Sequence, residues 1–187
     1  MKKNLRQVFL GVLFLIAGST AFSTVGFAAD PGAYYTKINI WYEKPQKILS
    51  TNYHKGTMIP VGSEVEVIKN GRKKIQFREK SSGTVFTIKL IKKFTNLNAD
   101  EFFGRYFLKD NVLNGTQYNS FSAMEKENIK AGTIKEGMSK EAVLMAYGYP
   151  PTHRTSSARE NTWVYWKSRL QNFLVQFKDN KVVSTGL

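Results

Sequence analysis

The stretch of residues 137–183, GMSKEAVLMAYGYPPTHRTSSARENTWVYWKSRLQNFLVQFKDNKVV, decides the fold of the C-terminal third of the chain. Its first part predicts a helix, because Ser139 can accept a capping hydrogen bond and apolar residues then recur at helical spacing. Gly148 can adopt the left-handed conformation that ends a helix, and Pro150-Pro151 cannot continue one. We therefore expect one helix between Ser139 and Gly148.

Three short strands are predicted after this helix, at residues 162–167, 172–178 and 181–185. Asp179-Asn180 can form a tight turn between the last two strands. Apolar residues alternate with polar ones in the middle strand, which is typical of a sheet with one buried face. The segment therefore predicts a small antiparallel sheet that packs on a helix.

This segment resembles the SmpA/OmlA (BamE-like) family of small bacterial envelope proteins. The resemblance is carried by Gly137-Met138-Ser139, Val143, Gly148-Tyr149-Pro150, Trp163-Val164-Tyr165, Val175-Gln176-Phe177 and Asp179-Asn180. It implies two helices packed on a three-stranded antiparallel sheet, with the first helix at residues 126–133 and with Trp163 and Tyr165 in the core. It also implies a role in outer-membrane protein assembly or envelope maintenance, through recognition of another envelope protein. The family fold is similar to the repeat of the β-lactamase inhibitor proteins, which makes a protein inhibitor a further alternative.

Residues 1–28 predict a secretory signal peptide. Cations precede an apolar run at residues 8–17, and Gly26-Phe27-Ala28 fits a cleavage site. We expect cleavage after Ala28 and a periplasmic or secreted protein, with peripheral association to the outer membrane as an alternative. The chain has no cysteine, so it forms no disulfide and carries no lipid on a cysteine, unlike many members of the resembling family.

The sequence is strongly basic, with a formal net charge of +14. Such a charge attracts anionic partners, of which lipid headgroups and cell-wall polymers are the ones expected outside the cytoplasm. Export makes nucleic acid an unexpected partner. Composition therefore favours envelope proteins and anionic envelope surfaces as partners.

Residues 29–113 predict a β-rich domain. Strands are expected at residues 33–42 and 48–53, followed by a meander of strands at 64–69, 72–79 and 84–91. Asn70-Gly71 is a preferred pair for the turn between the first two meander strands. The meander is similar in length and strand order to bacterial SH3-like modules and is expected to curl into a small barrel.

The remaining elements complete an α+β fold. A helix is expected from Asn98 to Phe107, where it closes the barrel. Residues 114–125 are rich in Asn, Gly and Ser and predict a linker. The C-terminal domain is then expected at residues 126–187.

No arrangement of residues typical of an active site occurs in the sequence. His54 and His153 are expected in loops of different domains, without ligand spacing around either. Neither a Gly-x-Ser-x-Gly motif nor a phosphate-binding glycine loop is found. The sequence predicts a protein without enzymatic activity, metal or cofactor.

Three surfaces are candidates for binding. The first is a basic sheet face for anionic surfaces, formed by Lys69, Arg72, Lys73, Lys74, Arg78, Lys80 and Lys89. The second is a protein contact formed by Trp166 with His153, Arg154 and Arg159. The third is an aromatic platform for cell-wall glycan or peptide, formed by Trp41, Tyr42 and Tyr53. The alternatives for these residues are a solvated face for the first surface and core packing for Trp166.

Overall fold

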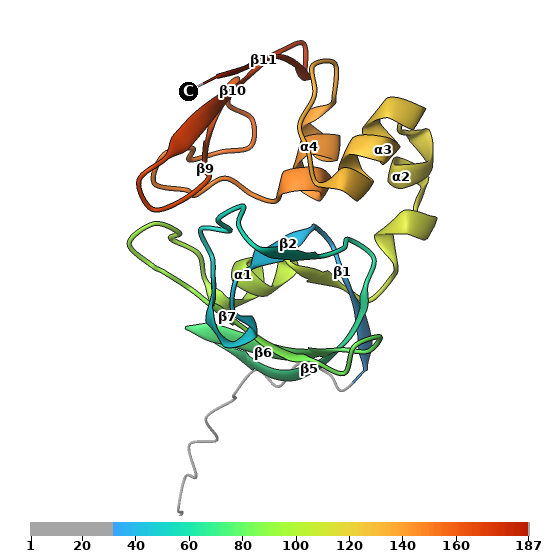
Figure 1. Cartoon of the computed structure of the whole chain (residues 1–187), viewed down its shortest axis with the longest axis vertical. Coiled ribbons are helices and arrows are strands. Elements are labelled where there is room, and N and C mark those ends of the chain that lie inside the picture. Colours follow the sequence, from blue (N-terminus) through green and yellow to red (C-terminus); the bar gives the residue numbers. More distant parts are fainter. Residues whose placement is uncertain (1–31, 187) are drawn as a thin grey trace, which may run out of the picture.

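Two units stack on one another in the computed structural model, which describes residues 32–186 (Figure 1). The N-terminal unit is a curled sheet, and the C-terminal unit combines helices with a smaller sheet. The chain passes between them along one side of the molecule. The predicted α+β class is confirmed, whereas the predicted signal peptide at residues 1–28 lies outside the described residues.

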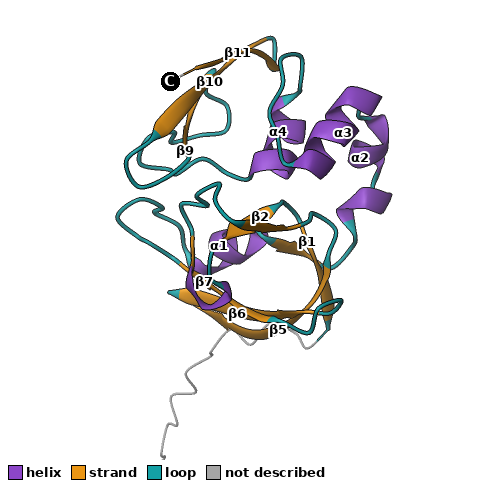
Figure 2. Ribbon diagram, viewed as in Figure 1, coloured by secondary structure: helices purple, strands orange, loops and turns teal. Residues whose placement is uncertain are grey.

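The N-terminal unit is built on a six-stranded sheet with the order β3-β7-β6-β5-β1-β8. Its strands are β1 (Ala33–Thr36), β3 (Ile48–Leu49), β5 (Glu64–Gly71), β6 (Lys74–Glu79), β7 (Val85–Lys89) and β8 (Phe107–Leu108). A separate pair, β2 (Ile40–Tyr42) and β4 (Thr57–Ile59), lies on the side that faces the C-terminal unit (Figure 1). The sheet curls around a core in which Ile40, Phe77 and Ile88 are fully buried (Figure 2).

The predicted strand at residues 33–42 is wrong, because Asn39 divides it into β1 and β2. Asn39 is fully buried between the two units. Its side-chain amide donates to the carbonyls of Ile129 at 2.7 Å and Ala146 at 3.0 Å, and its side-chain oxygen accepts from the Val61 amide at 2.7 Å. These bonds use both donor hydrogens and one acceptor position of the amide, and they fix the chain where it turns toward the C-terminal unit.

The turn between β5 and β6 lies two residues later than predicted. A β-bulge between Val67 and Lys69 shifts the register, so that Asn70 pairs with Ile75 and Gly71 with Lys74. Asn70 and Gly71 therefore belong to β5, and the turn is at residues 72–73. One face of the meander points inward, where Val65, Ile75 and Ile88 are fully buried.

The outer face of β7 is covered, which the sequence did not predict. The short helix η1 (Pro45–Lys47) places Gln46 over this strand, and its Oε1 accepts a hydrogen bond from the Thr87 hydroxyl at 3.1 Å. The predicted strand at residues 48–53 is reduced to β3, which pairs with β7 in parallel. Thr87 is therefore buried, although it points away from the core.

The closing helix is shorter than predicted. Asn98 caps α1 (Ala99–Gly104) in a capping box with Glu101, and Phe102 is fully buried. The helix ends before Phe107 because that residue belongs to β8, where it pairs with Thr36 of β1. Pairing with the sheet thus ends the helix earlier than its apolar composition indicates.

The predicted linker at residues 114–125 contains regular structure. It holds the end of η2 (Val112–Asn114), all of α2 (Thr116–Ser120) and the beginning of α3 (Ala123–Ala131). These helical turns are too short to give a periodic apolar pattern. The chain therefore crosses between the units as packed structure, in which Phe121 is buried.

The C-terminal unit matches its prediction closely. Its elements after α3 are α4 (Lys140–Tyr147), β9 (Thr162–Trp166), β10 (Asn172–Lys178) and β11 (Lys181–Gly186), with the sheet order β11-β10-β9. Ser139 caps α4, and Gly148 ends it with a φ of 81°. Asp179 and Asn180 both have positive φ angles in the turn between β10 and β11. Trp163 and Tyr165 are buried, as expected.

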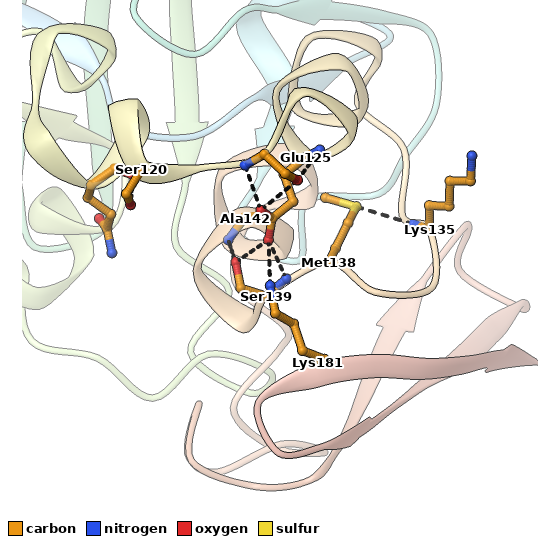
Figure 3. A network of polar contacts seen from close by, with 9 residues as sticks. Ser120, Glu125, Lys135, Met138, Ser139, Ala142 and Lys181 are labelled. Carbon is orange, nitrogen blue, oxygen red and sulfur yellow. Dashed lines mark hydrogen bonds and ion pairs between the residues drawn. The ribbon is translucent and has the colours of Figure 1, made fainter.

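The beginnings of α3 and α4 share one buried carboxylate, that of Glu125 (Figure 3). It accepts hydrogen bonds from the amide and hydroxyl of Ser122, both at 3.0 Å, and from those of Ser139 at 2.8 and 2.7 Å. Lys181 of β11 adds an ion pair at 3.2 Å. One side chain thus holds two helix caps and the sheet together, which we call the Glu125 cluster.

Candidate functional site

The seam between the two units is held by polar contacts to the end of α4. The Asn52 side-chain amide donates to the Tyr147 carbonyl at 3.0 Å, and Nε2 of His54 lies 2.8 Å from the same oxygen. Gly148 follows directly, and a Cβ atom there would lie 2.5 Å from Asn52 Nδ2. The left-handed glycine that ends α4 therefore also allows the two units to approach.

Aromatic rings continue this seam on both sides of His54. The imidazole stacks on Tyr147, and Trp41 meets it edge-on with ring centroids 5.5 Å apart. Farther along, Tyr53 stacks on Trp166 at 6.1 Å. The seam thus contains two groups of aromatic rings, one around His54 and one around Trp166, and each joins residues of both units.

Trp166, the central residue of the predicted protein contact, lies at the seam between the two units. It is half-buried at the seam, with Phe94 at 5.7 Å and His153 at 5.6 Å in addition to Tyr53. Arg154 and Arg159 are exposed. The apolar outer face of β9 is therefore covered by the N-terminal unit. This arrangement agrees with core packing, the alternative given above for Trp166.

The predicted aromatic platform lies in one groove. Trp41, Tyr42 and Tyr53 line a hollow of about 350 Å³, which we call the aromatic groove. Residues between β2 and β4 form most of its wall, and the loop between β9 and β10 completes it. The cations that line the groove are Lys44, Lys47, Lys55 and Arg169, and its acidic residue is Glu43.

The groove combines two chemical properties. Aromatic rings provide apolar faces with little loss of conformational entropy on binding. Lysine and arginine provide positive charge at the rim, which attracts carboxylates and phosphates. Such a site can bind a ligand that has both flat apolar faces and anionic groups.

The predicted basic face is of mixed charge. Arg78 forms an ion pair with Glu66, and Lys80 forms one with Glu64. The other five residues, Lys69, Arg72, Lys73, Lys74 and Lys89, are exposed. They gather around the turn between β5 and β6, where Lys74 pairs with Lys89 of β7. The cations that form no described ion pair thus lie at one end of the face.

The His54 imidazole is buried at the seam, and this changes its pKa. Burial lowers its pKa from 6.5 to about 3, although the carbonyls of Tyr147 and Trp166 favour the protonated ring. The imidazole of His54 is therefore neutral in the folded protein. His153 lies on the other side of Trp166 and is exposed, so the two histidines do not form a common site.

Within residues 32–186, no three His, Asp or Glu side chains lie close enough together to hold a metal ion. In the same part of the chain, no helix has the length and apolar character needed to cross a membrane.

Comparison with protein-family models, with curated proteins and with solved structures gives no match for this chain. The similarity of residues 137–183 to the SmpA/OmlA family therefore depends on the residues quoted above and stays a prediction.

Sequence reasoning found the aromatic residues of the groove but missed its cations. Lys44, Lys47 and Lys55 lie close to Trp41, Tyr42 and Tyr53 in the sequence, and this interleaving was a usable signal. Arg169 comes from the other unit, and only the packing of the seam brings it to the groove.

Proposed function

We propose that this chain is an exported, non-enzymatic binding protein of the bacterial cell envelope that recognises cell-wall glycan or peptide through the aromatic groove. The observation that carries this proposal is the convergence of Trp41, Tyr42 and Tyr53 on one hollow. The predicted signal peptide and the SmpA/OmlA resemblance support the envelope as its location.

The groove suits a flat or extended ligand. Apolar faces of sugar rings or of peptide side chains lose water when they pack on aromatic rings, and this burial is favourable. The hollow is open along the seam and is lined by polar groups that can orient a ligand. Recognition therefore requires no chemical step.

Sedimentation of the full chain with purified peptidoglycan tests this proposal. We expect the wild-type protein to sediment and the double variant Tyr42→Ala, Tyr53→Ala to lose at least about tenfold in affinity. Tyr118→Ala is the matched control, because Tyr118 is a partly buried tyrosine that packs in the C-terminal core, away from the groove. A wild-type protein that stays in the supernatant, or a double variant that binds as well as Tyr118→Ala, contradicts the proposal.

The SmpA/OmlA resemblance supports a second candidate, recognition of another envelope protein during outer-membrane assembly or maintenance. Arg154 and Arg159 are the predicted contact residues that stay exposed. Crosslinking in living cells from a probe at Arg154, compared with one at Lys74, tests this candidate. A specific protein adduct from Arg154 alone supports it, and equal or absent adducts contradict it. No described residue supports the inhibitor alternative.

A further inference from the structure

A second hollow adjoins the aromatic groove along the seam. It has a volume of about 450 Å³ and is lined by residues of both units, among them Trp41, His54, Tyr147, Lys167 and Phe173. Trp41 lines both hollows. The loop between β9 and β10 also borders both, since Lys167 lines the second hollow while its near neighbours Ser168 and Arg169 line the first.

Trp41, which lines both hollows, has a hydrogen-bond donor without an acceptor. Nε1 of Trp41 is buried and has no acceptor among the described residues, and the same is true of Nε1 of Trp166 nearby in the seam. A buried donor without a partner is unfavourable and is rare in folded proteins. The nitrogen has almost no exposed surface, so a ligand oxygen reaches it only when the Trp41 indole turns toward the hollow.

Charge is distributed very unevenly around these two hollows. Their lining residues include five cations, Lys44, Lys47, Lys55, Lys167 and Arg169, against one acidic residue, Glu43. None of the five forms an ion pair within residues 32–186. This contrasts with the middle of the basic face, where Glu64 and Glu66 pair with Lys80 and Arg78. The seam is therefore a place where positive charge is available to a ligand.

We infer that the two hollows form one extended site across the seam, which binds an anionic glycan strand. Sugar rings pack on Trp41, Tyr42 and Tyr53, and carboxylate or phosphate groups of the strand contact the lysines and Arg169. Ring or hydroxyl oxygens accept from the Trp41 indole once it turns toward the hollow. The inference rests on the proposed function and adds two points to it. The ligand must be anionic, and the C-terminal unit supplies part of the site through Lys167 and Arg169.

Calorimetric titration of the full chain with defined polymers tests the ligand class. The probes are oligogalacturonate, which carries carboxylates, dextran phosphate, which carries phosphates, and neutral dextran of similar length. We expect at least one anionic glycan to bind about tenfold or more tightly than neutral dextran, and the tighter of the two identifies the anionic group. Poly-L-glutamate tests for charge without sugar rings. The inference would be overturned if poly-L-glutamate bound as tightly as the anionic glycans. It would also be overturned if neutral dextran bound as tightly as they do.

A pair of variants tests the role of the seam. Lys167→Gln, Arg169→Gln removes two seam cations, and Lys130→Gln, Lys178→Gln removes two cations of the C-terminal unit that line neither hollow. All four side chains are exposed, so both variants are expected to fold normally. We expect the seam variant to bind the preferred glycan about tenfold more weakly and the control variant to change by less than about twofold.

The outcome separates this inference from the proposed function. If wild-type protein sediments with peptidoglycan but the seam variant binds like the control variant, the extended anionic site is wrong while the aromatic groove stands. If the wild-type protein binds neither peptidoglycan nor any of the glycans, both proposals fail.

Discussion

The Glu125 cluster and the seam are two places where this protein buries polar groups between separate elements, and they do so differently. In the Glu125 cluster, every oxygen of the carboxylate has partners from Ser122, Ser139 or Lys181. At the seam, the indole nitrogens of Trp41 and Trp166 are buried without acceptors among the described residues, and Trp41 lines two hollows. A satisfied network stabilises a fold, whereas unused donors beside a cavity favour a binding site.

The two regions also respond differently to acid. Burial alone would raise the pKa of Glu125, but hydrogen bonds from Ser139 and Ser122 outweigh it and hold the pKa at about 2. For His54 burial dominates and lowers the pKa to about 3. The carboxylate is thus stabilised in its charged form and the imidazole in its neutral form.

Among single substitutions, the largest expected effect is that of Glu125→Gln. The amide cannot accept all the hydrogen bonds of the carboxylate and leaves Lys181 without its ion pair, so we expect a loss of about 3 kcal/mol in the free energy of unfolding. Urea denaturation measures this loss. Glu127→Gln, at an exposed position of α3, is the control. A loss below about 0.5 kcal/mol for Glu125→Gln would show that the cluster is not structural.

Gly132→Ala is expected to cost about 2 kcal/mol. Gly132 has a φ of 66°, and an added Cβ atom would lie 2.7 Å from Trp41 Cζ2 and 2.8 Å from Met58 Sδ. Gly83→Ala is a close control, because Gly83 has a φ of 67° but nothing within 4 Å of an added Cβ. Thermal denaturation of the two variants isolates the contact with Trp41. Equal losses would show that Trp41 is not held firmly at the seam.

Acid is expected to weaken the seam before it weakens the Glu125 cluster. The folded state favours neutral His54, so its contribution is complete above pH 6.5 and is lost as the pH falls from 6.5 toward 3, by up to about 1.4 kcal/mol per pH unit. The contribution of Glu125 is complete above its ordinary pKa of 4.5 and is lost as the pH falls toward 2.

Urea denaturation at pH 6.5, 5.5 and 4.8 measures the contribution of His54 in a window where Glu125 stays charged. The His54→Asn variant is expected to lose most of this pH dependence. A wild-type protein whose stability does not change across this range would contradict the burial of a neutral His54.

The smallest effect is expected on the basic face. Lys74 is exposed and forms no ion pair with a described residue. We therefore expect Lys74→Gln to change the free energy of unfolding by less than about 0.5 kcal/mol. Binding to vesicles that contain anionic lipid tests the predicted role of this face. A large loss of vesicle binding in Lys74→Gln would assign function to the face rather than to the seam.

The sequence predicted the C-terminal unit well because its signals are local. Ser139 and Gly148 lie at the ends of their helix, and Asp179-Asn180 lies at the turn that it forms. In contrast, the break at Asn39 depends on carbonyls of Ile129 and Ala146, about half the chain away. No local pattern contains that information.

The candidate site shows the same limit. Trp41, Tyr42 and Tyr53 could be recognised as aromatic residues without an evident core position, and the structure brings them to one groove. Lys167 and Arg169 join the site only because the outer face of β9 packs on the N-terminal unit. The packing of Trp166 against Tyr53 that creates this seam could not be derived from either segment alone.

The most direct test of the seam as the binding surface is a two-dimensional NMR titration that observes the three tryptophan indole N–H groups during addition of oligogalacturonate. Trp163 is an internal control, because its indole already donates to the Glu160 carbonyl at 3.0 Å inside the C-terminal core. Assignment by tryptophan-to-phenylalanine variants identifies each signal. We predict that the Trp41 signal moves most, that the Trp166 signal follows, and that the Trp163 signal stays in place. A Trp41 signal that does not move when the glycan binds, or a Trp163 signal that moves as far, would contradict the account.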